Sequence, residues 1–364
     1  MTQAHIPYGR QSIDESDISA VEAVLCGAWL TQGPAVEAFE EAVALKVQAR
    51  HAVAFSSGTA ALHGCTAVAG LGPGDLVVTS PLTFMASANC ARYVGASVGL
   101  VDIRPETLNL DMAQIPAEAD AVVAVHYAGL PVDLRGMKVR PRVVIEDAAH
   151  ALGVSTPDGP VGNCARSDMC MFSFHPVKPI TTGEGGIVTT NDDSLAHKLR
   201  QFRTHDIERT PDHGAWTYRI SELGFNYRMT DIQAALGLSQ LTKLDTFIQR
   251  RNELADRYRA MLASLPVVLP PEAPPGFTHG YHLFAIRVRD RERVFEGLRS
   301  AGIGVQVHFV PIHHHPISAD IGVGPDDLPA CEEAYEQLIS LPIFPDLTEA
   351  EQDRVVATLA SLVT

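Results

Sequence analysis

Long apolar runs are missing from this sequence, and no stretch approaches the roughly 18 residues that a membrane-spanning helix needs. The first residues, MTQAHIPYGRQSIDESD, contain no apolar segment typical of a secretory signal. Cysteine is scarce as well: the six cysteines lie far apart without a C-x-x-C pair, which excludes a dense disulfide framework. These absences predict a protein of a reducing compartment, and we expect it in the cytoplasm.

Basic residues are in the minority, since 28 lysines and arginines stand against 43 acidic residues. The formal net charge of -15 argues against nucleic acid or an anionic membrane as a partner. A complete G-x-G-x-x-G motif and a Walker lysine are also missing, so neither a dinucleotide site nor an ATP site is predicted. An anionic ligand would therefore have to meet a local cluster of donors.

The composition does support a large core, because the chain has 364 residues of which 46% are hydrophobic. Between residues 51 and 175, strands that are apolar on both faces alternate with helical stretches, which predicts an α/β fold with a mostly parallel sheet and flanking helices. A long helix is predicted over 229–265, and a strand over 303–312. We expect a large domain over 1–240 and a smaller α+β domain over 241–364.

Polar residues follow directly after the predicted strands. In sheets of this kind ligands bind at the carboxyl ends of the strands, so these residues should converge on one rim. Gly58 and Thr59 lie at a strand-to-helix junction, where free amides and the helix dipole favour a phosphate, although simple helix capping would explain them equally well. Ser173 is a second candidate phosphate donor, and Phe84 is an aromatic that could stack on a ring.

The stretch HPVKPITTGEGG places Lys178 between two prolines and ahead of three glycines. This pattern is typical of a loop that presents a lysine as a nucleophile, and also of an ordinary surface turn. Asp147 emerges from an apolar run, where an unpaired carboxylate would be costly. It either caps a helix or pairs with a protonated ring nitrogen of a ligand, and His150 could lie beside the same ligand. A phosphate cradle, a carboxylate, an aromatic and a lysine are together the parts of a pyridoxal phosphate (PLP) site.

Several segments carry a resemblance to a known family over nearly the whole chain; they include SSGTAALH, EDAAHALG, FSFHPVKPITTGEGG, LGFNYRMTDIQAALGLSQL and GIGVQVHFVPIH. The sequence resembles the sugar-nucleotide aminotransferases, which are PLP enzymes of fold type I with an aspartate-aminotransferase-like fold. Within that family it is most similar to the UDP-4-amino-4,6-dideoxy-N-acetyl-β-L-altrosamine transaminases of pseudaminic acid synthesis.

The resemblance implies a role for each matching residue. Lys178 matches the lysine that bonds to the cofactor, and Asp147 matches the acid paired with the pyridine nitrogen. Phe84 matches the stacking position, and Thr59 with Ser173 match the phosphate contacts. Asn226 matches a residue that reaches the phosphate from the other subunit, which implies a homodimer with shared active sites. Arg228 is a candidate clamp for an amino-donor carboxylate or for the nucleotide diphosphate, and His308 is a candidate for the sugar pocket.

The implied reaction moves an amino group from L-glutamate to C4 of a UDP-linked 4-keto-6-deoxy-N-acetylhexosamine. Regiochemistry depends on how the sugar is oriented, so a C3-keto or dTDP-linked sugar is an alternative. A related dehydratase is disfavoured, because those relatives carry histidine where this chain has Lys178. A non-catalytic ligand-sensing protein is the alternative from another class, and the retained Lys178 and Asp147 count against it. A plain nucleotide-binding α/β protein would leave their placement unexplained.

Two further features bear on the prediction. Asp206 stands where the resembled family carries glycine, which could shift a loop. The run His313 to His315 suggests metal binding, but adjacent side chains on an extended segment point in alternate directions, so no metal site is predicted.

Overall fold

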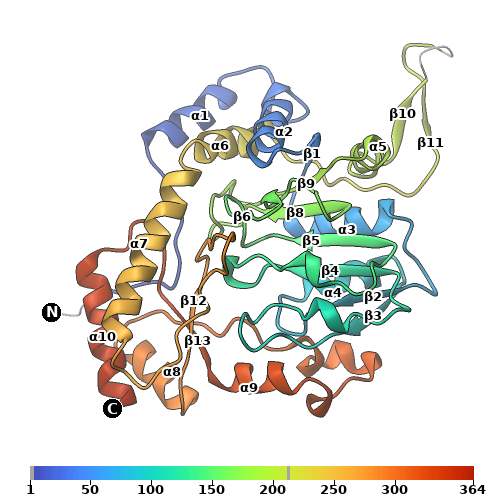
Figure 1. Ribbon diagram of the computed structural model, residues 1–364. Helices are drawn as coiled ribbons and strands as arrows, with labels where there is room; N and C mark the ends of the chain where they lie inside the picture. The colour runs from blue at the N-terminus through green and yellow to red at the C-terminus, as the bar shows by residue number, and fades with distance from the viewer. Residues whose placement is uncertain (1–3, 211–213) are drawn as a thin grey trace.

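The computed structural model describes residues 4–210 and 214–364. A seven-stranded sheet in the order β1-β9-β8-β5-β4-β2-β3 forms its centre (Figure 1). The strands are β1 (His51–Phe55), β2 (Leu76–Thr79), β3 (Ser97–Leu100), β4 (Ala121–Val125), β5 (Val143–Asp147), β8 (Met169–Ser173) and β9 (Gly186–Thr190). Only β9 runs antiparallel to its neighbours, so the predicted mostly parallel α/β sheet is confirmed.

Helices cover both faces of this sheet, as its apolar strands require. Successive side chains of β1 alternate between two cores: Val53 and Phe55 face one, and Ala52 and Ala54 face the other. The first core is closed by α3 (Gly58–Val68) and α5 (Asp193–Phe202), with α4 (Ala86–Tyr93) beside them, and the second by α2 (Pro34–Val47) and α6 (Asp231–Leu241). A sheet buried on both faces explains why these strands are apolar throughout instead of alternating with polar residues.

A further core lies in the C-terminal part of the chain. It unites α7 (Leu244–Leu262), α8 (Arg291–Ser300), α10 (Glu349–Val363) and the antiparallel pair β12 (Phe284–Arg287) and β13 (Leu338–Leu341). Ile6, from the start of the chain, is buried in the same core. In Figure 1 these elements gather beside the sheet, with α7 running along their edge. The division near residue 240 stays a prediction.

The structure corrects two predicted elements. The helix expected over 229–265 is interrupted, because α6 ends at Leu241 and α7 begins at Leu244. Neither glycine nor proline marks this break. The strand expected over 303–312 is also wrong: the segment makes isolated bridges, from Ile303 to Ile6 and from Gln306 to Ser340, and no regular strand.

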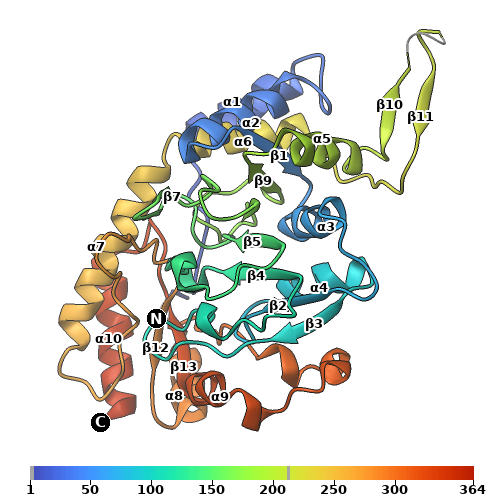
Figure 2. The ribbon, with the colours of Figure 1, turned by 45° about the vertical axis from the view of Figure 1, so that its right-hand side comes forward.

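A two-stranded hairpin of β10 (Ile207–Arg209) and β11 (Tyr218–Ile220) projects from the body of the molecule (Figures 1 and 2). Two large apolar side chains of this arm face solvent, since Tyr218 and Ile220 are both more than half exposed. Within the part of the chain that the structure describes, no helix is long and apolar enough to cross a bilayer.

Candidate active site

A cavity of about 420 Å³ opens at the carboxyl ends of the parallel strands. All of the predicted site residues except two line it: Gly58, Thr59, Phe84, Asp147, His150, Ser173, Lys178 and His308. They come from segments far apart in the sequence and meet because parallel strands end at the same edge of the sheet. The structure therefore brings them together as the strand-end rule predicts, although their individual roles stay predictions.

One end of the cavity is a cradle built on the first turn of α3. Ser57 caps this helix, because its hydroxyl oxygen accepts from the Ala60 amide at 3.1 Å. The amides of Gly58 and Thr59 in this turn have no intrahelical acceptor, so they are free to bind an anion. The hydroxyl of Ser173 lies directly beside Gly58, where an added Cβ would approach the Ser173 Oγ to 3.2 Å.

Gly186 explains part of the glycine-rich stretch after the lysine. It begins β9 and pairs with Ser173 of β8. A Cβ at this position would collide with the backbone of Ser57 and Gly58. Only glycine therefore lets β9 pass this close beneath the cradle.

Asp147 ends β5 and is held in one orientation by two donors. The Ser87 hydroxyl donates to its Oδ2 at 2.7 Å, and the Ala149 amide donates to its Oδ1 at 3.2 Å. Ser87 in turn contacts the Thr83 hydroxyl at 2.9 Å. Although Asp147 is only 7% exposed, it has no ion-pair partner among the described residues. A buried carboxylate in a cavity wall is suited to a cationic group on a ligand.

Lys178 lies on the loop between β8 and β9. Its amide donates to the carbonyl of His175 at 2.9 Å, which closes a turn that includes Pro176. Its Nζ lines the cavity and has no hydrogen bond or ion pair within the described residues. Burial lowers the pKa of Lys178 to about 8, while the Asp147 carboxylate acts in the opposite direction. About a tenth of the amine is therefore neutral at pH 7, which is the form that a nucleophile needs.

Histidines form a second wall of the cavity. His150 packs against His282, with ring centroids 4.2 Å apart and ring planes tilted by 33°, and burial lowers the pKa of both well below the usual histidine value. His308 bonds to the Ser340 hydroxyl through Nδ1 at 2.9 Å, and burial together with Lys178 lowers its pKa to about 4. All three rings are thus neutral at pH 7, so they can donate or accept a hydrogen bond without adding charge.

Sequence reasoning missed two of these residues. Ser87 lies in α4, one turn beyond the strand end that carries Phe84. His282 comes just before β12, at the amino end of a strand, so the strand-end rule does not select it. The only local signal for His282 is a histidine next to an apolar run, which is common in protein cores.

Asn226 and Arg228 are the two predicted residues that lie outside the cavity. Asn226 is exposed and pairs through its backbone with Thr204, near the foot of the hairpin. Arg228 is half-buried. Within one chain, therefore, neither residue lines the cavity that holds Lys178.

Asp206 shows how the chain accommodates a residue where the resembled family has glycine. Its φ of 57° lies in the left-handed region that favours glycine. Its Oδ2 accepts from the amides of Ser221 and Glu222 at 2.9 and 2.7 Å, which ties the two sides of the hairpin base together. Aspartate tolerates this conformation better than most residues, and these two bonds offset its strain.

The chain matches the model of the DegT/DnrJ/EryC1/StrS aminotransferase family over residues 11–360. It belongs to this family. A curated relative, the UDP-4-amino-4-deoxy-L-arabinose--oxoglutarate aminotransferase of Shewanella sediminis, is 35% identical over 100% of this chain and 99% of its own length. Members of the DegT/DnrJ/EryC1/StrS family are PLP-dependent sugar aminotransferases, so this chain is an enzyme of that kind.

Two solved structures share the fold over almost their whole length. Spr1654 of Streptococcus pneumoniae in its PMP form has a TM-score of 0.92 at 27% identity, covering 98% of this chain and 99% of that one. The same protein is also solved in a PLP form. PseC of Helicobacter pylori, an aminotransferase involved in the biosynthesis of pseudoaminic acid, has a TM-score of 0.90 at 28% identity, covering 99% of both chains. The predicted fold type I is thereby confirmed.

The cavity residues of this DegT/DnrJ/EryC1/StrS aminotransferase fit PLP. The cradle at Gly58 and Ser173 provides amides and a hydroxyl for the phosphate, and Asp147 offers an unpaired carboxylate for the ring nitrogen. The Nδ1 atoms of His150 and His282 are buried without a protein partner, which leaves donors or acceptors for a polar ligand. Lys178 has a free amine in the same cavity.

Proposed function

We propose that this enzyme transfers an amino group from L-glutamate to C4 of a UDP-linked 4-keto-6-deoxy-N-acetylhexosamine, as in pseudaminic acid synthesis. The observation that carries the amino-transfer chemistry is the free amine of Lys178 in one cavity with the buried carboxylate of Asp147. The choice of substrate is supported by two relatives. One is named for a UDP-4-amino sugar and oxoglutarate, and the other for pseudoaminic acid biosynthesis.

Lys178 has two tasks in this proposal. Its amine, where neutral, is the group that would hold PLP covalently, and the same amine would be placed to move a proton during the amino transfer. PLP supplies the carbonyl for imine exchange and a ring that accepts the electrons left when that proton departs. Asp147 would hold the ring nitrogen of PLP through its carboxylate, which is buried and fixed by the Ser87 hydroxyl. The cradle at α3 would hold the phosphate, so that the ring of PLP lies between the Lys178 amine and the Asp147 carboxylate.

The second half of the reaction uses the same groups in reverse on the keto-sugar. His308 lines the cavity and is neutral at pH 7, so it suits hydrogen bonding to a sugar hydroxyl better than pairing with an acid. Arg228 stays a proposed clamp for a donor carboxylate or for the diphosphate. The predicted cytoplasmic location stays a prediction.

A comparison of sugar substrates tests the proposal. With L-glutamate as donor, we expect kcat/KM for the UDP-linked 4-keto-6-deoxy sugar to exceed that for the dTDP-linked sugar and for a 3-keto isomer by about 100-fold. Nuclear magnetic resonance of the product should place the new amine at C4. Preference for the dTDP sugar or an amine at C3 would favour the alternative substrate class, and no amino transfer to any sugar would favour a ligand-sensing protein.

We also propose that the enzyme is a homodimer with shared active sites. Asn226 is exposed outside its own cavity, so its predicted phosphate contact needs a second subunit. The exposed Tyr218 and Ile220 of the hairpin, and a groove of about 690 Å³ at its base whose apolar lining includes Tyr93, Phe202 and Leu223, offer a surface that a second copy would cover. Light scattering should therefore give twice the chain mass of 39.2 kDa. A monomeric mass would contradict the shared sites.

A further inference from the structure

The segment with three consecutive histidines does not have the extended backbone that the sequence predicted. Residues Ile312–His314 form a 3-10 turn, and this turn directs the rings of His313 and His314 to the same point. The reason given against metal binding, that neighbouring side chains on an extended segment diverge, therefore does not hold for these two residues.

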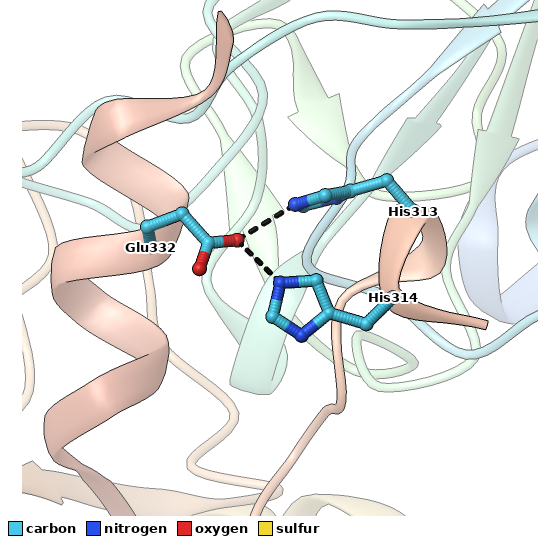
Figure 3. Close-up of side chains that lie close together, drawn as sticks. All are labelled: His313, His314 and Glu332. Atoms are coloured by element: carbon cyan, nitrogen blue, oxygen red, sulfur yellow. Dashed lines mark hydrogen bonds and ion pairs between the residues drawn. The ribbon is translucent and has the colours of Figure 1, made fainter. Parts of the chain in front are cut away.

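Both rings meet Glu332 of α9 (Pro329–Gln337), as Figure 3 shows. The Nε2 of His313 lies 2.6 Å from Glu332 Oε1, and the Nε2 of His314 lies 2.8 Å from the same oxygen. The ring planes are nearly perpendicular, at 82°, with centroids 4.6 Å apart. Each of the three residues offers one ligand atom, and these three atoms all lie within 4.8 Å of one another.

The backbone on both sides of this cluster is held in place. The amide of Ile312 donates to the carbonyl of Pro81 at 2.9 Å, which anchors the turn to the segment after β2. The Asp102 carboxylate accepts from the amides of Ala330 and Cys331, both at 2.9 Å, which anchors the start of α9. These hydrogen bonds fix the turn and the start of α9, so the three ligands are pre-organised and little ordering would be needed on binding an ion.

We propose that His313, His314 and Glu332 form a binding site for a divalent transition metal, with Zn²⁺ as the best-suited ion. Two imidazole nitrogens and one carboxylate are a donor set that Zn²⁺ prefers, and water would complete a tetrahedron. Tetrahedral ligands about 2.1 Å from zinc lie about 3.4 Å apart, so the three atoms need only small side-chain shifts.

Access and burial fit this role. The side chain of His313 is 1% exposed, whereas those of Glu332 and His314 are 20% and 28% exposed. One ligand is therefore fixed in the protein interior while the other two open the site to solvent.

The site would also connect two parts of the molecule. His313 in this turn lies four residues after Phe309, which lines the active-site cavity with His308. A metal joining the turn to α9 would therefore brace this cavity wall without touching Lys178. The bound ion should raise the thermal unfolding midpoint, because it binds the folded state and not the unfolded chain.

Zinc titration of the holoenzyme, prepared free of metal, tests the proposal by calorimetry and by mass spectrometry of the bound metal. We expect one Zn²⁺ per chain, no comparable binding of Mg²⁺, and a higher midpoint with zinc. His314→Ala and Glu332→Gln should each weaken binding by at least about 100-fold. The matched controls His315→Ala and Glu333→Gln change the neighbouring histidine and the next carboxylate of α9, and should bind as the parent does.

Circular dichroism and the cofactor absorption band check that each variant is folded and loaded. Equal zinc binding by Glu332→Gln and Glu333→Gln would overturn the proposal, as would the absence of saturable binding by the parent protein. Either result would identify the cluster as an ion pair that only secures the turn.

Discussion

Replacing Lys178 with alanine is expected to lower the rate of amino transfer by at least about 1,000-fold, because the chain loses both its nucleophile and its proton carrier. The cradle and Asp147 remain, so PLP should still bind, but without a covalent bond to the protein. The absorption band of the covalently bound cofactor should be absent, and added L-glutamate should convert the cofactor far more slowly. The fold should be intact, since the Lys178 Nζ has no protein partner to leave unpaired.

Two further variants sharpen this experiment. Lys178→Arg keeps a positive charge, but its guanidinium stays protonated and so cannot act as a neutral amine; it should be as inactive as Lys178→Ala. Lys138→Ala removes an exposed lysine far from the cavity and should behave as the parent. Near-parent activity of either Lys178 variant would assign the catalytic amine to another residue.

The rate at which Lys178 bonds to added PLP should depend strongly on pH. Only the neutral amine attacks, and the pKa of Lys178 is lowered to about 8 by burial. The rate should therefore rise about tenfold per pH unit below that value and level off above it, so that pH 6 is about 100-fold slower than the plateau. Stopped-flow absorption of the apoprotein with PLP measures this profile. Dividing by the rate with free Nα-acetyllysine removes the titration of PLP itself.

Substitution of Asp147 tests whether the midpoint of this pH profile moves in the expected direction. Its carboxylate favours the charged form of Lys178, so Asp147→Asn should lower the lysine pKa further and move the midpoint to lower pH. Ser87→Ala removes a hydrogen bond to Asp147 but leaves the charge, so its midpoint should stay with the parent. A parent midpoint near the ordinary lysine value of 10.5, or an unmoved midpoint in Asp147→Asn, would contradict the assigned environment.

Much of the site could be predicted because it obeys a rule that links chain order to space. Asp147 and Ser173 end parallel strands, and Lys178 follows on the next loop, so all three had to reach the same edge of the sheet. The residues around Lys178 could also be interpreted from the local sequence, because proline restricts the backbone and glycine frees it. The prediction needed no knowledge of which strands are neighbours.

Other features depend on contacts that chain order does not encode. The antiparallel direction of β9 follows from the route of the loop that carries Lys178. The apolar pattern of a strand is the same for both directions, so it does not predict which one the strand takes. The break between α6 and α7 has no glycine or proline to mark it. His282 reaches the cavity only because the C-terminal part of the chain packs against the sheet, and its position before a strand gives no hint of this.

The sequence by itself determined the chemical groups of the site, which are a buried acid, a lysine on a rigid loop and a phosphate cradle. It also placed them at the ends of strands whose apolar residues require a sheet covered on both faces. The tertiary structure decided which distant residues complete these groups. Ser87 orients Asp147, His282 packs against His150, and Glu332 brings His313 and His314 to one oxygen. The reason is physical: strand ends follow from local pattern, whereas side chains separated by many residues meet only when helices and loops pack.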